Sequence, residues 1–516
     1  MSTARPDLPA RPASLRGDGH AAHRQTPALA AAVEDLRPRL GGQALLPGDP
    51  AIAHVREVYN AMHGGRPALT IRCAGAADVA AAVRFAREHD LAPAVRGGGH
   101  SIAGLSAIDG GLLLDLSPMD GVQVDPQRRI AHVQGGALWA DVDRETQALG
   151  LATPGGVVSD TGVAGLTLGG GYGWLRRKHG LSCDNVVAAQ VVCADGELRT
   201  ASADVNPDLF WAIRGGGGNF GVVTSFDFAL HPLGPDVAFA ATFYPLEQVA
   251  DVLRDWRSYV GGAPDEVTSV VVTVTMPRDP ALPPPVQGRA VAIVGGVYAG
   301  DVEAGMRVMQ PLRELGTPLF DMSGPTPFTG VQSGFDWLFP RNAQRSYWKS
   351  QYLDELSDGA VEAIAGAALS RPSPVAVVAT FHMGGAIRRV APDATAFSER
   401  DPEFMVSIDG NWADPAQDDE VVGWVRARWA QIREFGTGAV YLNFTGLSDE
   451  PLDAGVDSAF GRNLRRLAEV KATYDPDNLF RRNHNIAPTA ARAGDGRAQR
   501  RAPQASAGAG AGAPVR

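Results

Sequence analysis

The stretch Arg96-Gly97-Gly98-Gly99-His100-Ser101-Ile102-Ala103-Gly104 places one cation, three successive glycines and a histidine directly after an apolar segment, residues 91–95. Glycine adopts backbone conformations that other residues avoid, and it leaves its N–H group uncovered. Three glycines in a row can therefore wrap an anion such as a diphosphate. His100 stands at the mouth of that cradle. The stretch predicts a loop that holds a phosphate-bearing ligand.

Two further glycine clusters follow, T-G-V-A-G-L-T-L-G-G-G-Y-G-W at 161–174 and R-G-G-G-G-N-F-G at 214–221. So many glycines among apolar residues weaken packing, which favours a flat ligand lying against the backbone. A Rossmann unit needs G-x-G-x-x-G between a strand and a helix, with an acidic residue about 20 positions further on. None of the three clusters meets this pattern, because strand-like alternation follows Gly221 and no helical run follows His100. The clusters indicate another nucleotide-binding design.

The length of 516 residues predicts two or three domains, and 45% hydrophobic with 20% charged residues is typical of a globular protein with a large core. A net charge of −10 argues against a general affinity for nucleic acid. We find no run of ~18 apolar residues that would predict a membrane helix and no signal-type segment near the N-terminus. The cysteines form neither a metal spacing nor a disulfide framework: Cys73, Cys183 and Cys193. We expect a cytoplasmic protein with no metal site.

The first half of the chain alternates short helices and strands. Apolar spacing from Leu29 predicts a helix that Pro38 ends, and a second helix follows Asp78 as its N-cap. An amphipathic helix is expected at 137–149. Strands are expected over 91–95, 111–116, 130–134 and 222–228. This pattern favours an α+β domain.

From about residue 235 the sequence pattern changes, and we expect a second α+β unit. Strands are predicted at 267–275, 290–297, 375–381 and 405–412. Helices are predicted at 353–368 and 420–435. A strand at 440–444 and a helix at 462–470 come next. The closing Asn483-His484-Asn485-Ile486 suggests that the chain returns to the first domain.

Five segments in this order resemble the berberine-bridge-enzyme-like, FAD-linked oxidases of the vanillyl-alcohol-oxidase fold: Arg96–Ser101, 161–173, 214–224, Tyr441-x-Asn443 and 474–486. The resemblance is strongest to the bacterial branch that includes 6-hydroxy-D-nicotine oxidase, and it covers about residues 30 to 490. It implies an α+β fold with a PCMH-type FAD-binding domain at 27–234, whose core is about 65–234. It also implies a substrate domain with an antiparallel sheet at 235–438 and a BBE-like C-terminal segment at 439–490 that completes the FAD domain. Tails at 1–26 and 491–516 are expected to be disordered.

The same resemblance implies the cofactor site. The diphosphate would lie against Arg96, Gly97, Gly98, Gly99, His100 and Ser101, and His100 would carry the 8α-methyl group of FAD. The flavin ring and diphosphate would be lined by Thr161, Gly162, Gly165, Leu166, Gly169, Gly171 and Gly173. Gly221 and Val223 would lie at the adenine end. Asn483 and Asn485 are candidates to hydrogen-bond the flavin edge.

Two departures from the family pattern matter. Many relatives attach FAD a second time through a cysteine, and Val158 stands at that position, so we predict a single covalent link. Many relatives also carry a tyrosine base where this chain has Phe444. On the predicted strand Tyr441 and Asn443 face away from Phe444. The proton acceptor is therefore unassigned, with Tyr441, Asn443 and His382 as candidates for which a structural role is the alternative; an amine substrate that needs no side-chain base is a further alternative.

The resemblance implies an oxidoreductase that acts on a small molecule. Hydride would leave a C–H bond beside an alcohol or amine, and O2 would accept the electrons. Three alternatives stay open: a flavoprotein dehydrogenase with another acceptor, an NAD(P)H-dependent flavin reductase and a non-catalytic flavin-binding protein. The basic run Arg176-Arg177-Lys178 is expected on a solvated face or beside a phosphate.

Overall fold

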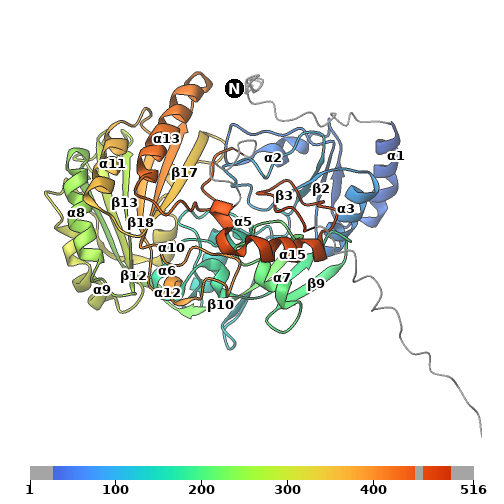
Figure 1. Ribbon diagram of the computed structural model, residues 1–516, viewed down its shortest axis with the longest axis horizontal. Helices are drawn as coiled ribbons and strands as arrows, with labels where there is room; N and C mark the ends of the chain where they lie inside the picture. Colours follow the sequence, from blue (N-terminus) through green and yellow to red (C-terminus); the bar gives the residue numbers. More distant parts are fainter. Residues whose placement is uncertain (1–26, 448–456, 490–516) are drawn as a thin grey trace, which may run out of the picture.

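A computed structural model describes residues 27–447 and 457–489 of the chain (Figure 1). The predicted tails at 1–26 and 491–516 lie outside the described residues. Helices accompany a four-stranded, a five-stranded, a two-stranded and an eight-stranded sheet, which confirms the predicted α+β class. Among the described residues, no helix is long and apolar enough to cross a membrane. The proposed domain boundaries stay a prediction.

The four-stranded sheet positions the first glycine loop. Its order is β1 (Gln43–Leu45), β2 (Leu69–Arg72), β4 (Leu112–Asp115) and β3 (Pro93–Arg96), with β2 and β3 parallel to β4. Since β3 ends at Arg96, the three glycines begin where the strand stops. Helix α1 (Pro27–Leu36) ends before Pro38, as predicted.

Helix α3 (Ala76–Glu88) packs on this sheet, but the predicted N-cap is wrong. Gly75 is the N-cap residue, and Asp78 lies in the first turn. The Asp78 carboxylate accepts hydrogen bonds from the backbone N–H groups of Gly41, Gly42 and Ala74 at 2.8, 2.9 and 2.8 Å. It therefore ties the helix start to the loop before β1.

The five-stranded sheet is antiparallel, and the third glycine cluster leads directly into its central strand. Its order is β5 (Val122–Asp125), β6 (Ile130–Gln134), β10 (Val222–Ala229), β8 (Val186–Val192) and β9 (Leu198–Ser202). The strands expected at 130–134 and 222–228 are confirmed, as is the helix after 137, which is α4 (Trp139–Gln147). A short helix that the sequence did not predict, α5 (Val163–Leu168), lies inside the second glycine cluster.

The eight-stranded sheet forms the other half of the molecule. Its main strands run in the order β12 (Asp236–Pro245), β14 (Ala290–Tyr298), β13 (Val267–Thr275), β18 (Val377–His382), β19 (Phe404–Trp412) and β17 (Arg345–Leu353), and each pair is antiparallel. The short strands β15 (Phe320–Asp321) and β16 (Gly324–Pro327) both pair with β12. All four strands predicted in this half are confirmed. The helix expected at 353–368 begins later, as α11 (Asp358–Leu369), because Leu353 ends β17.

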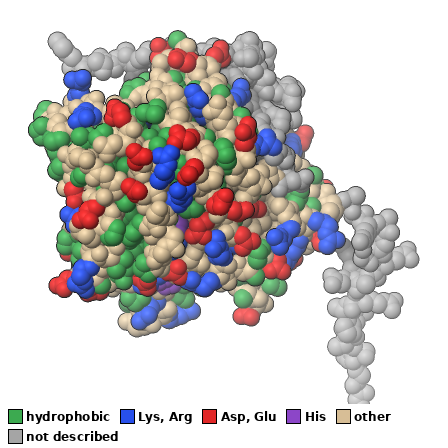
Figure 2. Space-filling model, turned by 60° about the vertical axis from the view of Figure 1, so that its left-hand side comes forward, with side chains coloured by type: hydrophobic (Ala, Val, Ile, Leu, Met, Phe, Trp, Pro, Cys, Tyr) green, Lys and Arg blue, Asp and Glu red, His purple; other side chains and the backbone are tan. Residues whose placement is uncertain are grey.

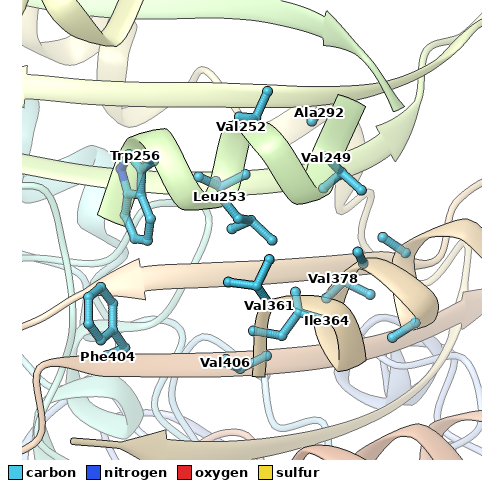
Figure 3. Close-up of a cluster of buried hydrophobic side chains, with 14 of the residues drawn as sticks. Val249, Val252, Leu253, Trp256, Ala292, Val361, Ile364, Val378, Phe404 and Val406 are labelled. Atoms are coloured by element: carbon cyan, nitrogen blue, oxygen red, sulfur yellow. The ribbon is translucent and has the colours of Figure 1, made fainter. Parts of the chain in front are cut away.

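Helices cover one face of this sheet (Figure 1). Figure 3 shows Leu253 and Trp256 of α8 (Val249–Val260) packed toward side chains of α11 and of strands β18 and β19. Helix α13 (Asp418–Arg433) adds Val421 and Val425 to the same core. The opposite face of the sheet is turned toward the glycine clusters, since Val270 and Ala379 share a core with Trp174.

The C-terminal segment returns to the five-stranded sheet, as the sequence predicted. Helix α15 (Leu464–Tyr474) contributes Leu467 and Val470 to the core beneath that sheet, and Ile486 joins them (Figure 1). The strand expected at 440–444 is wrong. The Phe444 N–H donates to the Tyr441 carbonyl at 3.0 Å, which closes a turn.

Candidate functional site: a cavity between glycine loops and a sheet

A cavity lies between the glycine clusters and the open face of the eight-stranded sheet. One wall comes from all three glycine clusters, and a second from strands β13, β17, β18 and β19. The C-terminal segment closes a third side with Phe480, Asn483 and His484. The geometry therefore brings together segments that lie up to about 390 residues apart in the chain.

The first and second glycine clusters touch each other through their backbones. A Cβ atom on Gly98 would lie 2.4 Å from the Gly162 Cα, and one on Gly162 would lie 2.5 Å from the Gly98 nitrogen. Gly99 has a φ of +69°, in the region that favours glycine. Gly97, Gly98, Gly99, His100 and Ser101 all line the cavity.

Arg96 does not line the cavity, contrary to the expectation that it cradles a phosphate. Its guanidinium donates to the Asp115 carboxylate at 2.8 Å and to the Glu57 carbonyl at 3.3 Å. The physical reason is that Arg96 still belongs to β3, beside Asp115 of β4. Arg96 therefore supports the loop from the side away from the ligand space.

The second cluster lines the cavity with Thr161, Gly162, Gly165, Leu166 and Gly169, and their contact with FAD stays a prediction. Gly171 and Gly173 do not line it, because both are packed against other backbone and side chains. A Cβ atom on Gly173 would lie 1.8 Å from the Gly155 carbonyl oxygen, and one on Gly171 would lie 2.4 Å from the Ser182 hydroxyl. These two glycines permit close packing behind the wall.

The third cluster and the C-terminal segment close the far end of the cavity. Gly221, Val223 and Asn483 line it, whereas Asn485 does not. The Asn483 side-chain N–H group donates to the Gly218 and Phe480 carbonyls at 3.0 and 2.8 Å. Its Oδ1 is buried and has no hydrogen-bond partner among the described residues. A buried acceptor of this kind calls for a donor, and the cavity is where one would come from.

His100 lies at the junction of the glycine loops and the sheet wall. Its Nε2 lies 3.1 Å from the Asp160 Oδ1, and its ring stacks on Tyr59 with 4.1 Å between centroids. Val158 also lines the cavity, at the position where a second attachment would need a cysteine. The three cysteines are buried and unpaired, and none of them lines the cavity.

The sheet wall is apolar except at one position. Alternate residues of β13 and β18 face the cavity, together with aromatic rings from β17 and from the segment before it: Val270, Val272, Val377, Ala379, Phe381, Trp348, Phe335 and Phe339. Among the described residues that line the cavity, Asp409 of β19 carries the single carboxylate. It lies opposite Trp348 and Val377 in the sheet register.

Asp409 is the functional candidate that the sequence analysis missed. It is 4% exposed, and burial raises its pKa from 3.8 to about 7, although the Ser407 hydroxyl donates a hydrogen bond to it. A carboxyl group with a pKa near 7 is suited to exchange protons at neutral pH. The signal was present in the predicted strand at 405–412, where Ser407, Asp409 and Asn411 share one face of an otherwise apolar strand.

Tyr441 and Asn443 hold the wall together. The Tyr441 hydroxyl accepts hydrogen bonds from the Gly171 N–H at 3.2 Å and from the Asn443 amide at 2.9 Å. The Asn443 amide also donates to the Leu166 carbonyl at 3.2 Å. Burial raises the pKa of Tyr441 well above its usual value. Because of the turn, Tyr441 and Phe444 do not face apart: their ring centroids are 5.0 Å from each other.

His382 lies away from the cavity, so the expectation that it accepts the substrate proton is corrected. On β18 Phe381 faces the cavity, and the next side chain points to the opposite face. The His382 ring there lies 6.3 Å from Trp256, and its Nε2 is 2.8 Å from the Arg177 guanidinium and 3.1 Å from the Glu403 carboxylate. Burial lowers the pKa of His382 to about 4.

The chain matches two family models. Residues 67–202 match the FAD binding domain, and residues 440–487 match the domain described as berberine and berberine like. The Bacillus subtilis (strain 168) protein YgaK, named an uncharacterized FAD-linked oxidoreductase, is 31% identical over 456 residues, which cover 87% of this chain and 98% of that protein. The chain belongs to the berberine-like family of FAD-linked oxidoreductases.

Named oxidases are among the relatives of this FAD-linked oxidoreductase. The (R)-6-hydroxynicotine oxidase of Paenarthrobacter nicotinovorans is 30% identical over 87% of this chain and 97% of its own length. The crystal structure of 6-hydroxy-D-nicotine oxidase from Arthrobacter nicotinovorans superposes with a TM-score of 0.76 at 28% identity, over 87% of this chain and 98% of that one. The family and fold that the sequence resembled are confirmed, and so is the class of enzyme.

The residues of the cavity fit FAD. Two glycine clusters in backbone contact leave no room for side chains at the cradle, and Asn483 offers an unsatisfied buried acceptor. The apolar sheet wall suits a flat aromatic ring. The roles of the individual lining residues toward FAD belong to the proposal that follows.

Proposed function

We propose that this FAD-linked oxidoreductase is an oxidase that holds FAD by one covalent bond to His100 and oxidises a small, largely apolar alcohol or amine. The observation that carries the proposal is the buried Asp409 on the apolar sheet wall, which is the one carboxylate among the described residues that line the cavity. Covalent attachment through one residue follows from Val158, which offers no second nucleophile.

FAD supplies the hydride acceptor when it is bound. The chain supplies the rest. The glycine loops bind the diphosphate through backbone N–H groups, and Tyr441 with Asn443 keeps the second cluster in place. Trp348, Phe339 and the valines of β13 orient the substrate and exclude water.

Asp409 acts as the proton acceptor in this proposal. A substrate hydroxyl or ammonium group that reaches Asp409 can transfer its proton to the carboxylate while the adjacent C–H bond gives up its hydride. The buried carboxylate accepts a hydrogen bond from Ser407, and no cation is paired with it among the described residues. A cationic amine would satisfy this unpaired charge, whereas a sugar would find few polar partners on the wall.

The test is anaerobic reduction of the purified protein's flavin by a panel of probes. The panel contains (R)-6-hydroxynicotine, which joins an aromatic ring to a cyclic amine, a benzylic alcohol, and xylobiose as a polar comparison. We expect the amine or the benzylic alcohol to bleach the flavin absorbance, and air to restore it with release of hydrogen peroxide. Bleaching by xylobiose alone would contradict the proposed substrate class, and reoxidation that produces no peroxide would contradict the oxidase assignment.

A further inference from the structure

The side chains of His100 and Asp160 are in contact, and the proposed function assigns no role to Asp160. Asp160 lies in the loop before α5, and its Oδ1 is 3.1 Å from the His100 Nε2. No hydrogen bond to the other ring nitrogen, Nδ1, is found among the described residues. Tyr59 stacks on one face of the imidazole ring, and Asp160 contacts its edge at Nε2.

Arg341 fixes Asp160 in turn. Its guanidinium lies 3.3 Å from the Asp160 Oδ2 and donates to the Asp160 carbonyl at 3.0 Å. A further bond reaches the Gly98 carbonyl at 2.6 Å. Arg341 belongs to the segment between the helical turn at 336–338 and β17, so it joins the sheet half of the molecule to both glycine clusters.

The charges define which ring nitrogen carries the proton. Burial alone would raise the pKa of Asp160, but the hydrogen bond from His100 and the nearby Arg341 outweigh burial and hold that pKa below its usual value. Asp160 is therefore a carboxylate, and a carboxylate only accepts hydrogen bonds. The proton of a neutral His100 must then sit on Nε2, which leaves the lone pair on Nδ1.

We propose that Asp160, held by Arg341, is a positioning residue for covalent attachment of FAD, and that it presents Nδ1 of His100 as the attacking atom. This inference rests on the proposed link between His100 and FAD. Without Asp160 the ring can rotate by half a turn about its bond to Cβ while it keeps its stacking on Tyr59, and either nitrogen then faces the cavity.

The attachment balances with O2 as the oxidant. A bond forms between Nδ1 and the 8α carbon of FAD, one C–H bond of that methyl group breaks, and the Nε2 proton is released toward Asp160. The two electrons remain on the flavin and pass to O2, which takes up the two protons and leaves as hydrogen peroxide. Asp160 contributes the orientation of the ring and the site that receives the imidazole proton.

The experiment adds FAD in air to full-length apoprotein from riboflavin-starved cells and follows acid-stable flavin fluorescence over time. The variants are Asp160→Ala, Asp160→Asn, Arg341→Gln and, as a matched control, Asp336→Asn. Asp336 binds the Ser159 N–H at 2.8 Å and the Ser159 hydroxyl, so its replacement loosens the same loop without touching His100. NMR of the isolated flavin peptide identifies the linked nitrogen.

We expect Asp160→Ala to slow attachment about tenfold or more, since a hydrogen bond to a charged group is lost, and to yield a mixture of Nδ1 and Nε2 links. Asp160→Asn keeps an acceptor for Nε2 and should retain the Nδ1 link at a reduced rate. Arg341→Gln should slow attachment through the same nitrogen, and Asp336→Asn should behave as the wild type.

If FAD attaches to the Asp160→Ala variant at the wild-type rate and through Nδ1 alone, the proposed role of Asp160 is overturned. Equal slowing by Asp336→Asn would overturn it as well, because it would reduce the effect to loop stability. If Asp160→Ala fails to fold, the role of Asp160 is tested with Asp160→Asn and Arg341→Gln instead. The two measurements are the rate at which FAD becomes attached and the ring nitrogen that carries it. A wild-type protein that never acquires acid-stable flavin would instead refute the proposed link to His100, which separates the two failures.

Discussion

Replacement of Asp409 by asparagine should slow flavin reduction and stabilise the protein at the same time. Asparagine has nearly the same shape and can still accept the Ser407 hydrogen bond, but it cannot take a proton. Loss of a general base lowers rates by about 10²–10⁴-fold. We expect a decrease of that order in the anaerobic rate of flavin reduction by whichever probe reduces the wild type. The wild-type rate should rise with pH through about 7, because the carboxyl group must be ionised.

The stability effect has the opposite sign and a defined pH dependence. A pKa that rises from 3.8 to about 7 on folding corresponds to roughly 4 kcal/mol against the folded state once Asp409 is ionised. The folded protein binds this proton more tightly than the unfolded chain, so the cost grows as pH rises from about 4 to 7. The Tm gain of Asp409→Asn over the wild type should therefore be larger at pH 8 than at pH 5.

Asp143→Asn is the matched control. Asp143 is also buried, its pKa is also raised to about 7, and the Gln332 amide donates to it at 3.0 Å, but it does not line the cavity. It should show the same pH-dependent gain in Tm with an unchanged rate of flavin reduction. If Asp409→Asn reduces its flavin as fast as Asp143→Asn does, the reasoning about the proton acceptor is refuted.

Three other changes have expected outcomes. His100→Ala should bind FAD in the folded state yet release it on acid precipitation, as absorbance of the supernatant will show; flavin that stays on the pellet would contradict this. Gly98→Ala should weaken FAD binding and destabilise the fold by about 1–3 kcal/mol, since its Cβ would lie 2.4 Å from the Gly162 Cα, and equilibrium dialysis with thermal melts measures both. His382→Gln should leave flavin reduction unchanged and make stability less acid-sensitive: the folded pKa of about 4 lies below the ordinary value of 6.5, so wild-type stability is lost as pH falls between them. A lower rate of flavin reduction in His382→Gln would contradict the conclusion that His382 lies outside the site.

Local sequence patterns predicted much of the fold because they act over short distances. The β13 and β19 strands and helix α13 follow apolar spacing that a single segment displays. Strand β17 was not predicted, because it is buried on both faces and mixes Lys349, Ser350 and Gln351 with aromatic residues. Its polar side chains find partners that only the assembled sheet provides.

The burial of charged side chains was the second feature that the sequence did not predict. Arg176 and Arg177 belong to the basic run expected on a solvated face or beside a phosphate; both are buried, so the solvated face is wrong for these two residues. The Arg176 guanidinium donates to the carbonyls of Gly173, of Ser269 in β13 and of His382 in β18. Burial lowers the pKa of Arg176 to about 9. The contact with His382 joins residues 206 positions apart, and spacing along the chain cannot predict a contact of that kind.

On the candidate site, the sequence indicated the glycine walls, His100 and a substrate domain whose sheet could form another wall, but not which residues of that sheet line the cavity. Glycine runs mark close backbone approach wherever they occur, which is why Gly98 and Gly162 were identified without knowledge that they touch. Asp409 became visible only when the sheet showed which face of β19 borders the cavity. On the face that Figure 2 draws, acidic and basic side chains are interspersed.

The mass of the denatured wild-type protein, followed by mapping of its proteolytic peptides, tests the central claim most directly. We predict a protein heavier than its sequence by one FAD less two hydrogens, with the added mass on the peptide that contains His100. A mass equal to that of the bare chain, or flavin attached at another residue, would contradict the account.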